Sequence, residues 1–105
     1  MQIQINTDHN IEGDEQLAAQ VKGVVADALS LFSEHITRVE VHLSDQHGDK
    51  PGMDQMRCMM EARLEGRQPA AVTNDAASLD EAVDGAAEKL KRLLESSLGK
   101  RYDHH

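Results

Sequence analysis

The sequence has almost no aromatic residues: among its 105 residues only Phe32 and Tyr102 are aromatic, and tryptophan is absent. A core must therefore be built from Ile, Val, Leu, Met and Ala side chains. Sites that stack nucleobases or sugars on aromatic rings are nearly excluded. The length supports one domain with a two-layer core and is too short for two independent cores.

Cysteine is nearly absent as well, and the lone Cys58 cannot form an internal disulfide. Because Cys58 lies in an apolar run, a buried structural thiol is favoured over a reactive one. No stretch approaches the roughly 20 apolar residues of a membrane span, and no charged-then-apolar signal peptide is present. We therefore expect a cytoplasmic protein without a membrane partner.

Sequence motifs of catalysis are also missing. There is no G-x-S-x-G, no glycine loop that cradles phosphates and no H-E-x-x-H. His42, Asp45, His47 and Asp49 lie close in sequence, but their spacing matches no recurrent metal site. We therefore expect no enzymatic activity, no cofactor and no metal site.

Basic residues are outnumbered by acidic ones, 11 to 19, which gives a formal net charge of −8. This balance alone disfavours nucleic acid as a partner. The charge is unevenly distributed, however. From Ala86 to the end, five Lys and Arg face three acids, a balance of +2, so the preceding 85 residues carry −10. The asymmetry permits a local basic patch on an acidic body.

The strongest pattern that is present is an amphipathic helix over Ser78 to Gly99. Ser78 and Glu81 form a capping box in which each side chain accepts from the other residue's backbone N–H, and Gly99 supplies a stop. One apolar stripe recurs at helical spacing. It consists of Leu79, Ala82, Val83, Ala86, Leu90, Leu93 or Leu94, and Leu98.

The second half of this helix turns basic, with Lys89, Lys91 and Arg92, and with Lys100 and Arg101 just beyond it. Such a cluster is suited to binding phosphates. It is not specific, because cations near a helix C-terminus also interact favourably with the helix dipole. We predict one domain over residues 1–99 and a basic, histidine-ending tail over 100–105 that we expect to be disordered.

Alternating apolar and polar residues predict four strands, over residues 1–6, 36–43, 56–64 and about 69–73. A helix with Asp14 as its N-cap is predicted to run to about Phe32. The chain between the second and third strands, residues 44–54, contains two glycines and a proline and is expected to be a mobile loop.

The predicted order is β-α-β-β-β-α, an α+β fold. The first helix must connect two parallel strands, whereas the short links between the later strands suit an antiparallel meander. We expect a four-stranded mixed sheet with both helices packed on one face. The other face would be exposed and would carry a charged ladder around Met59: Arg38, Glu40, His42, Arg57, Glu61 and Arg63.

Over nearly its whole length, the chain resembles the ribosome hibernation-promoting factor and ribosome-associated inhibitor A family, once called sigma-54 modulation proteins. The similarity is sharpest at Ile36 to Leu43, at Ser78-Leu-Asp-Glu-Ala-Val-Asp-Gly85 and at Glu88-Lys-Leu-Lys-Arg92. The last two segments match the family's acidic-capped final helix and its Lys-Leu-x-Arg block.

The resemblance implies a fold related to double-stranded RNA-binding domains. It implies binding to 16S rRNA of the small ribosomal subunit, near the decoding channel, by a short form that inhibits translation or stores ribosomes during stress, and no binding to DNA. Lys89 and Arg92 fall on basic positions of the family's last helix, and Lys91, Lys100 and Arg101 fall in its basic neighbourhood.

The first helix departs from the family pattern. It keeps Lys22 as a candidate rRNA contact but has Ala18, Val24 and Asp27 where relatives usually have Lys or Arg, and Asp80 replaces an aromatic residue of the last helix. An alternative is therefore a protein-interaction module of the same fold that has lost rRNA affinity. Such a module would bind a protein partner through its acidic surface.

Overall fold

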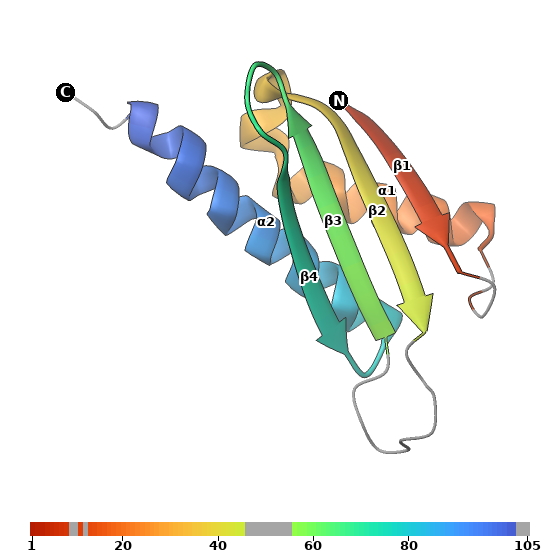
Figure 1. Ribbon diagram of the computed structural model, residues 1–105. Helices are drawn as coiled ribbons and strands as arrows, with labels where there is room; N and C mark the ends of the chain where they lie inside the picture. The colour runs from red at the N-terminus through yellow and green to blue at the C-terminus, as the bar shows by residue number, and fades with distance from the viewer. Residues whose placement is uncertain (9–10, 12, 46–55, 103–105) are drawn as a thin grey trace.

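Strands and helices follow one another in the predicted order. The computed structural model describes residues 1–8, 11, 13–45 and 56–102. Its elements are β1 (Gln2–Thr7), α1 (Glu15–Ala28), the 3₁₀ segment η1 (Ser30–His35), β2 (Ile36–Asp45), β3 (Met56–Leu64), β4 (Ala70–Ala76) and α2 (Leu79–Tyr102) (Figure 1).

The four strands form one sheet in the order β1-β2-β3-β4. β1 and β2 are parallel, and the other two pairs are antiparallel. The parallel pair requires a crossover, which α1 provides. Both helices cover the same face of the sheet, with α1 behind β1 and β2 and α2 behind β3 and β4 (Figure 1). The predicted mixed sheet and α+β class are confirmed.

The core lies between the sheet and the two helices and is almost entirely aliphatic. The central strands supply paired inward residues, such as Val41 opposite Met60 and Leu43 opposite Cys58. All four of these side chains are buried. From α2 the stripe is buried at Ala82, Val83, Ala86, Leu90, Leu94 and Leu98, together with Ala87, which was not predicted.

Helix α1 begins as predicted but ends early. The Asp14 carboxylate accepts a 2.8 Å hydrogen bond from the Leu17 backbone N–H. The prediction that the helix continues to Phe32 was wrong, because Leu29 leaves helical geometry at ψ 13° and a 3₁₀ segment follows. Serines at 30 and 33 are weak helix formers, and the tighter 3₁₀ turn still buries Phe32.

Strand β4 is longer than predicted and extends three residues past Thr73. Asn74 and Asp75 are poor strand formers, but each has a specific partner. Asp75 lies opposite Arg57 on β3 and accepts hydrogen bonds of 2.8 and 3.3 Å from it. The Asn74 amide donates to two carbonyls of α2, at Glu81 and Ala82. Tertiary contacts therefore override local propensity here.

Helix α2 continues through Gly99 to Tyr102, so the prediction that Gly99 ends it was wrong. A glycine in a helix costs about 1 kcal/mol relative to alanine, which does not end a helix by itself. Lys100 and Arg101 consequently belong to the last turn of α2, and the predicted disorder of residues 103–105 lies outside the described residues.

The predicted loop over residues 44–54 falls largely outside the described part of the chain, since β2 extends to Asp45 and the description resumes at Met56. Of the helices that are described, none is both long enough and apolar enough to cross a membrane.

The contact between α2 and β4 is close at Gly85. The Asn74 side chain occupies the space beside this glycine, and an ideal Cβ at Gly85 would lie 2.7 Å from Asn74 Cγ and closer still to its amide nitrogen. By contrast, a Cβ at Gly23 of α1 would meet no atom within 4 Å. A methyl group should therefore destabilise the fold at Gly85 but should be tolerated at Gly23.

We predict that Gly85→Ala lowers the free energy of unfolding by about 1–3 kcal/mol, because the new methyl displaces Asn74. The matched change Gly23→Ala should raise it by about 0.5–1 kcal/mol through helix propensity alone. Urea denaturation of both variants measures the difference. Adding Asn74→Ala to Gly85→Ala should cost less than the sum of the single changes; strict additivity would contradict the proposed contact.

Candidate nucleic-acid interface on helix α2

Helix α2 starts at a cap beside β4. The Ser78 hydroxyl oxygen accepts from the Glu81 backbone N–H at 3.2 Å, and the hydroxyl donates to the Glu81 carboxylate at 3.1 Å. The helix then crosses behind β3 and β4, and its C-terminal half extends past the free edge of β4 (Figure 1). The basic half of α2 therefore lies at the periphery of the domain.

Lys89 is exposed on the side of α2 that faces the β4 edge. Its ammonium donates a 2.9 Å hydrogen bond to the Thr73 backbone carbonyl. Asp75 is close enough for Lys89 to help lower the pKa of its carboxyl, although the hydrogen bond from Arg57 is the larger cause. The ammonium is thus held near a strand edge while keeping further donors for an external acceptor.

Arg92 lies one turn further along α2 and is well exposed. Its guanidinium contacts the Glu88 carboxylate at 3.2 Å, with 75% and 54% of the two side chains exposed. An ion pair at this level of exposure contributes little and is readily exchanged for another anion. Lys91, between Lys89 and Arg92, is only half-buried. Of these three residues of the predicted cluster, two are therefore exposed and one is partly covered.

Arg67, which no sequence pattern indicates as a site residue, also lies beside α2. It belongs to the turn between β3 and β4, where Gly66 has φ 71°, and its guanidinium donates to the Ser97 carbonyl at 3.3 Å. A groove of about 460 Å³ separates the turn from α2, and Leu93 lies 39% exposed in its wall. The remaining lining residues are Leu64, Gln68, Pro69, Ala70 and Ala71.

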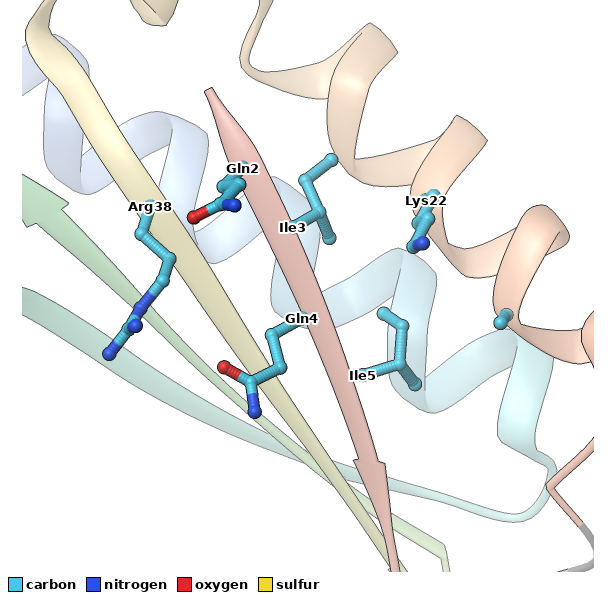
Figure 2. A pocket seen from close by; sticks show the side chains of 7 residues that line it. Gln2, Ile3, Gln4, Ile5, Lys22 and Arg38 are labelled. Atoms are coloured by element: carbon cyan, nitrogen blue, oxygen red, sulfur yellow. The ribbon is translucent and has the colours of Figure 1, made fainter.

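We call Arg67, Lys89 and Arg92 the α2 basic surface. Lys91 lies about 200° around the helix from Lys89, on the other side of the buried stripe, and is not part of it. Lys100 and Arg101 lie further along the same helix, in its last turn. Lys22 does not join this surface. It projects from α1 and lines a groove along β1, at the opposite edge of the sheet (Figure 2). The structure thus places Lys22 and Lys91 away from Lys89 and Arg92.

The open face of the sheet carries the predicted charged ladder, and its charges are mutually paired. Glu40 forms a hydrogen-bonded ion pair with Arg38 and lies 3.5 Å from the Arg63 guanidinium and 3.7 Å from the His42 ring. The Arg38 hydrogen bond is the main cause that lowers the Glu40 pKa. Because carboxylates neutralise these arginines, the open face is a weaker anion site than the α2 basic surface.

Cys58 and the histidines are the other residue types that could carry chemistry. Burial raises the pKa of Cys58 to about 12, so the thiol stays protonated, as predicted for a structural cysteine. Among the described residues, no group of three or more His, Cys, Asp and Glu side chains could hold a metal ion. His47 and Asp49 of the predicted loop lie outside that part of the chain.

The fold and the site together define a two-layer α+β domain whose last helix presents cations at a sheet edge. The family model for "Sigma 54 modulation protein / S30EA ribosomal protein" matches residues 3–102. The chain belongs to this family, and the resemblance seen in the sequence is confirmed.

Solved structures agree with the fold. The N-terminal domain of Protein Y from Thermus thermophilus is 22% identical, with a TM-score of 0.73 over 92% of this chain and 99% of that one. A ribosomal subunit interface protein from Coxiella burnetii is 14% identical, with a TM-score of 0.70 over 95% and 100%. At these identities the likeness shows a shared fold. None of the curated proteins compared with the chain matches it.

The paired carboxylate of Asp75 predicts a pH dependence. Arg57 lowers the Asp75 pKa in the folded state, so the pair stabilises the fold above the unfolded-state pKa, and this contribution is lost as the pH falls through the folded-state pKa. Urea denaturation of wild type and Asp75→Asn should show a constant difference above about pH 5 that shrinks toward about pH 3. A difference independent of pH would contradict this assignment.

Proposed function

We propose that this chain is a non-catalytic translation inhibitor or hibernation factor. It would act in the cytoplasm and bind 16S rRNA of the small ribosomal subunit near the decoding channel. Family membership over residues 3–102 supports an association with ribosomes, as does the fold shared with a ribosomal subunit interface protein. The observation that carries the proposal is the α2 basic surface, where Lys89 and Arg92 are exposed beyond the sheet edge.

Binding would rest on direct contacts to phosphates. Lys89 offers a point charge, whereas the planar guanidinium of Arg92 can donate two parallel hydrogen bonds to one phosphate. Arg67 would extend the contact along the same side of the molecule, and Lys100 and Arg101 would extend it along α2. With this surface on rRNA, the domain would block the decoding channel by occupying it, so inhibition needs no chemical step.

The negative charge of the rest of the protein would orient it as it binds rRNA. A formal net charge of −8 repels the phosphate backbone from most directions, and the positive balance of +2 is confined to the last 20 residues. A domain with this charge distribution is attracted to RNA most strongly when α2 faces it. Lys22, at the opposite sheet edge, would need a second RNA segment to contribute.

Co-sedimentation with purified small subunits and whole ribosomes tests the proposal. Binding through phosphates should weaken steeply with salt, because each neutralised phosphate contributes about −0.7 to −0.9 to the slope of log affinity against log salt. We expect binding to the small subunit at low salt and much weaker binding at 200 mM salt. No binding at low salt would contradict the proposal.

We predict that Lys89→Glu combined with Arg92→Glu weakens small-subunit binding by at least about tenfold and reduces the salt slope by about 1.5, the share of two phosphate contacts. Both side chains are exposed, so the fold should persist, and circular dichroism checks this. The matched control Lys89→Arg with Arg92→Lys keeps both charges and should bind within about twofold of wild type. Unchanged binding by the Glu variant would overturn the assignment of the site.

Removing the Glu88 carboxylate, which competes with rRNA for Arg92, should strengthen binding instead of weakening it. Glu88→Gln frees the Arg92 guanidinium from its 3.2 Å ion pair and removes one negative charge from the surface. We expect binding to tighten by about two- to fivefold, in line with the energy of an exposed charge contact. The isosteric change Glu15→Gln, on α1, alters net charge equally and should have a smaller effect; equal gains from both changes would indicate net charge instead of a local contact.

A further inference from the structure

Strand β1 is a free edge of the sheet. One hydrogen bond shows which of its residues bond β2 and which direct their backbone groups away from the sheet. The Asp8 backbone N–H donates to the Leu43 carbonyl, directly after the ladder that pairs Thr7 with Leu43. In a parallel pair, alternate residues direct both backbone groups to the neighbouring strand. Even-numbered residues of β1 therefore bond β2, and Ile3 and Ile5 direct their N–H and C=O groups away from the sheet.

This edge lacks three of the devices that prevent pairing with another chain. Natural edge strands are commonly protected by charged side chains, proline or bulges. The strand reads Gln-Ile-Gln-Ile-Asn-Thr and contains no charge and no proline, and its register with β2 is unbroken. A groove of about 480 Å³ follows four consecutive residues of this strand, from Gln2 to Ile5.

The walls of the groove are apolar on one side and cationic at the rim. Ile3 and Ile5 point toward α1, where Ala18 and Lys22 complete the wall, while Gln2 and Gln4 lie on the opposite side of β1 (Figure 2). Arg38 of β2 lines the groove beyond the two glutamines and is 38% exposed despite its ion pair. If another strand paired with β1, its side chains would alternately face the isoleucine side and the glutamine side of the groove.

The charged side chains that line the groove are positive, whereas the protein carries a net negative charge. Its lining contains no carboxylate and two cations, Lys22 and Arg38, of which Arg38 is already paired with Glu40 outside the lining, on a chain with a net charge of −8. Within the described residues, Lys22 has no hydrogen bond or ion pair. An occupant with carboxylates beside Lys22 and Arg38 would therefore be attracted, and it would supply Lys22 with a counter-charge.

A second copy of this chain fits the groove poorly. Pairing β1 with β1 of another molecule would place uncharged strands side by side, with Lys22 and Arg38 of both copies around them and no carboxylate from either groove. It would also bring together two bodies that each carry −8. Like charges disfavour this arrangement.

We propose that the β1 edge binds an acidic, extended segment of a protein partner by strand addition. Backbone groups of Ile3 and Ile5 would supply the ladder hydrogen bonds, and Lys22 would select for acidic side chains, with a smaller contribution from the Glu40-paired Arg38. This function does not use the α2 basic surface, which lies at the other edge of the sheet. Both surfaces could be occupied at once.

A fluorescein-labelled peptide of alternating glutamate and valine is the probe, measured by fluorescence anisotropy without ribosomes. Two control peptides separate the contributions. Replacement of glutamate by lysine reverses the charge, and replacement of the central valine by proline removes ladder hydrogen bonds at constant charge. We expect saturable binding of the acidic peptide only.

Amide hydrogen exchange by NMR gives the decisive readout. The acidic peptide should slow exchange at Ile3 and Ile5, whose N–H groups face the groove, and leave Gln4 nearly unchanged, because its N–H already bonds β2. Peptide binding without this alternation would show attraction by charge alone and would overturn the proposal. Protection of Ile3 and Ile5 that rises with protein concentration in the absence of peptide would identify a second copy as the occupant, and would overturn it too.

Variants test the role of charge. Lys22→Glu should weaken peptide binding by about fivefold or more, and Lys22→Arg should retain it. The remote change Arg92→Glu alters net charge equally and should leave peptide affinity within about twofold of wild type. Equal losses from Lys22→Glu and Arg92→Glu, or no saturable binding by wild type, would contradict the proposed site.

Discussion

The attachment of α2 to β4 by the Asn74 amide is the contact on which the arrangement of the site depends. The side chain donates at 3.3 and 3.2 Å to carbonyls at the start of α2, and Gly85 leaves room for it. Together with the buried Ala82 and Val83, this contact positions the start of the helix against the sheet. Because the helix is straight and buried through Leu98, its origin and direction also decide that Lys89 reaches the β4 edge and that the later turns extend beyond it.

The sequence predicted elements best where burial is periodic. β3 was predicted over its observed range, and the inward faces of β2 and β3 follow from strict alternation that only one register can bury. The ends of elements were less predictable, since they depend on partners distant in sequence. Asp75 stays in β4 because Arg57 lies opposite it, and Gly99 stays helical beside a buried Leu98.

The candidate site could be predicted only in part, for the same reason. Lys89 and Arg92 are three residues apart on one helix, so their shared face follows from the sequence alone, whereas Lys91 lies on another side. Arg67 comes from a turn whose position beside Ser97 depends on the packing of α2 against the sheet. Lys22 was grouped with the others through the family resemblance, but its helix covers the opposite half of the sheet, and no sequence pattern indicates that separation.

The paired charges on the open sheet face also determine how thick the domain is. Arg38 of β2 and Arg63 of β3 both pair with Glu40, so this face remains stable in water without a third layer of structure to cover it. The molecule is therefore a slab one sheet and one helix layer deep. A slab of this kind can enter a narrow space between two larger bodies without rearranging its own core.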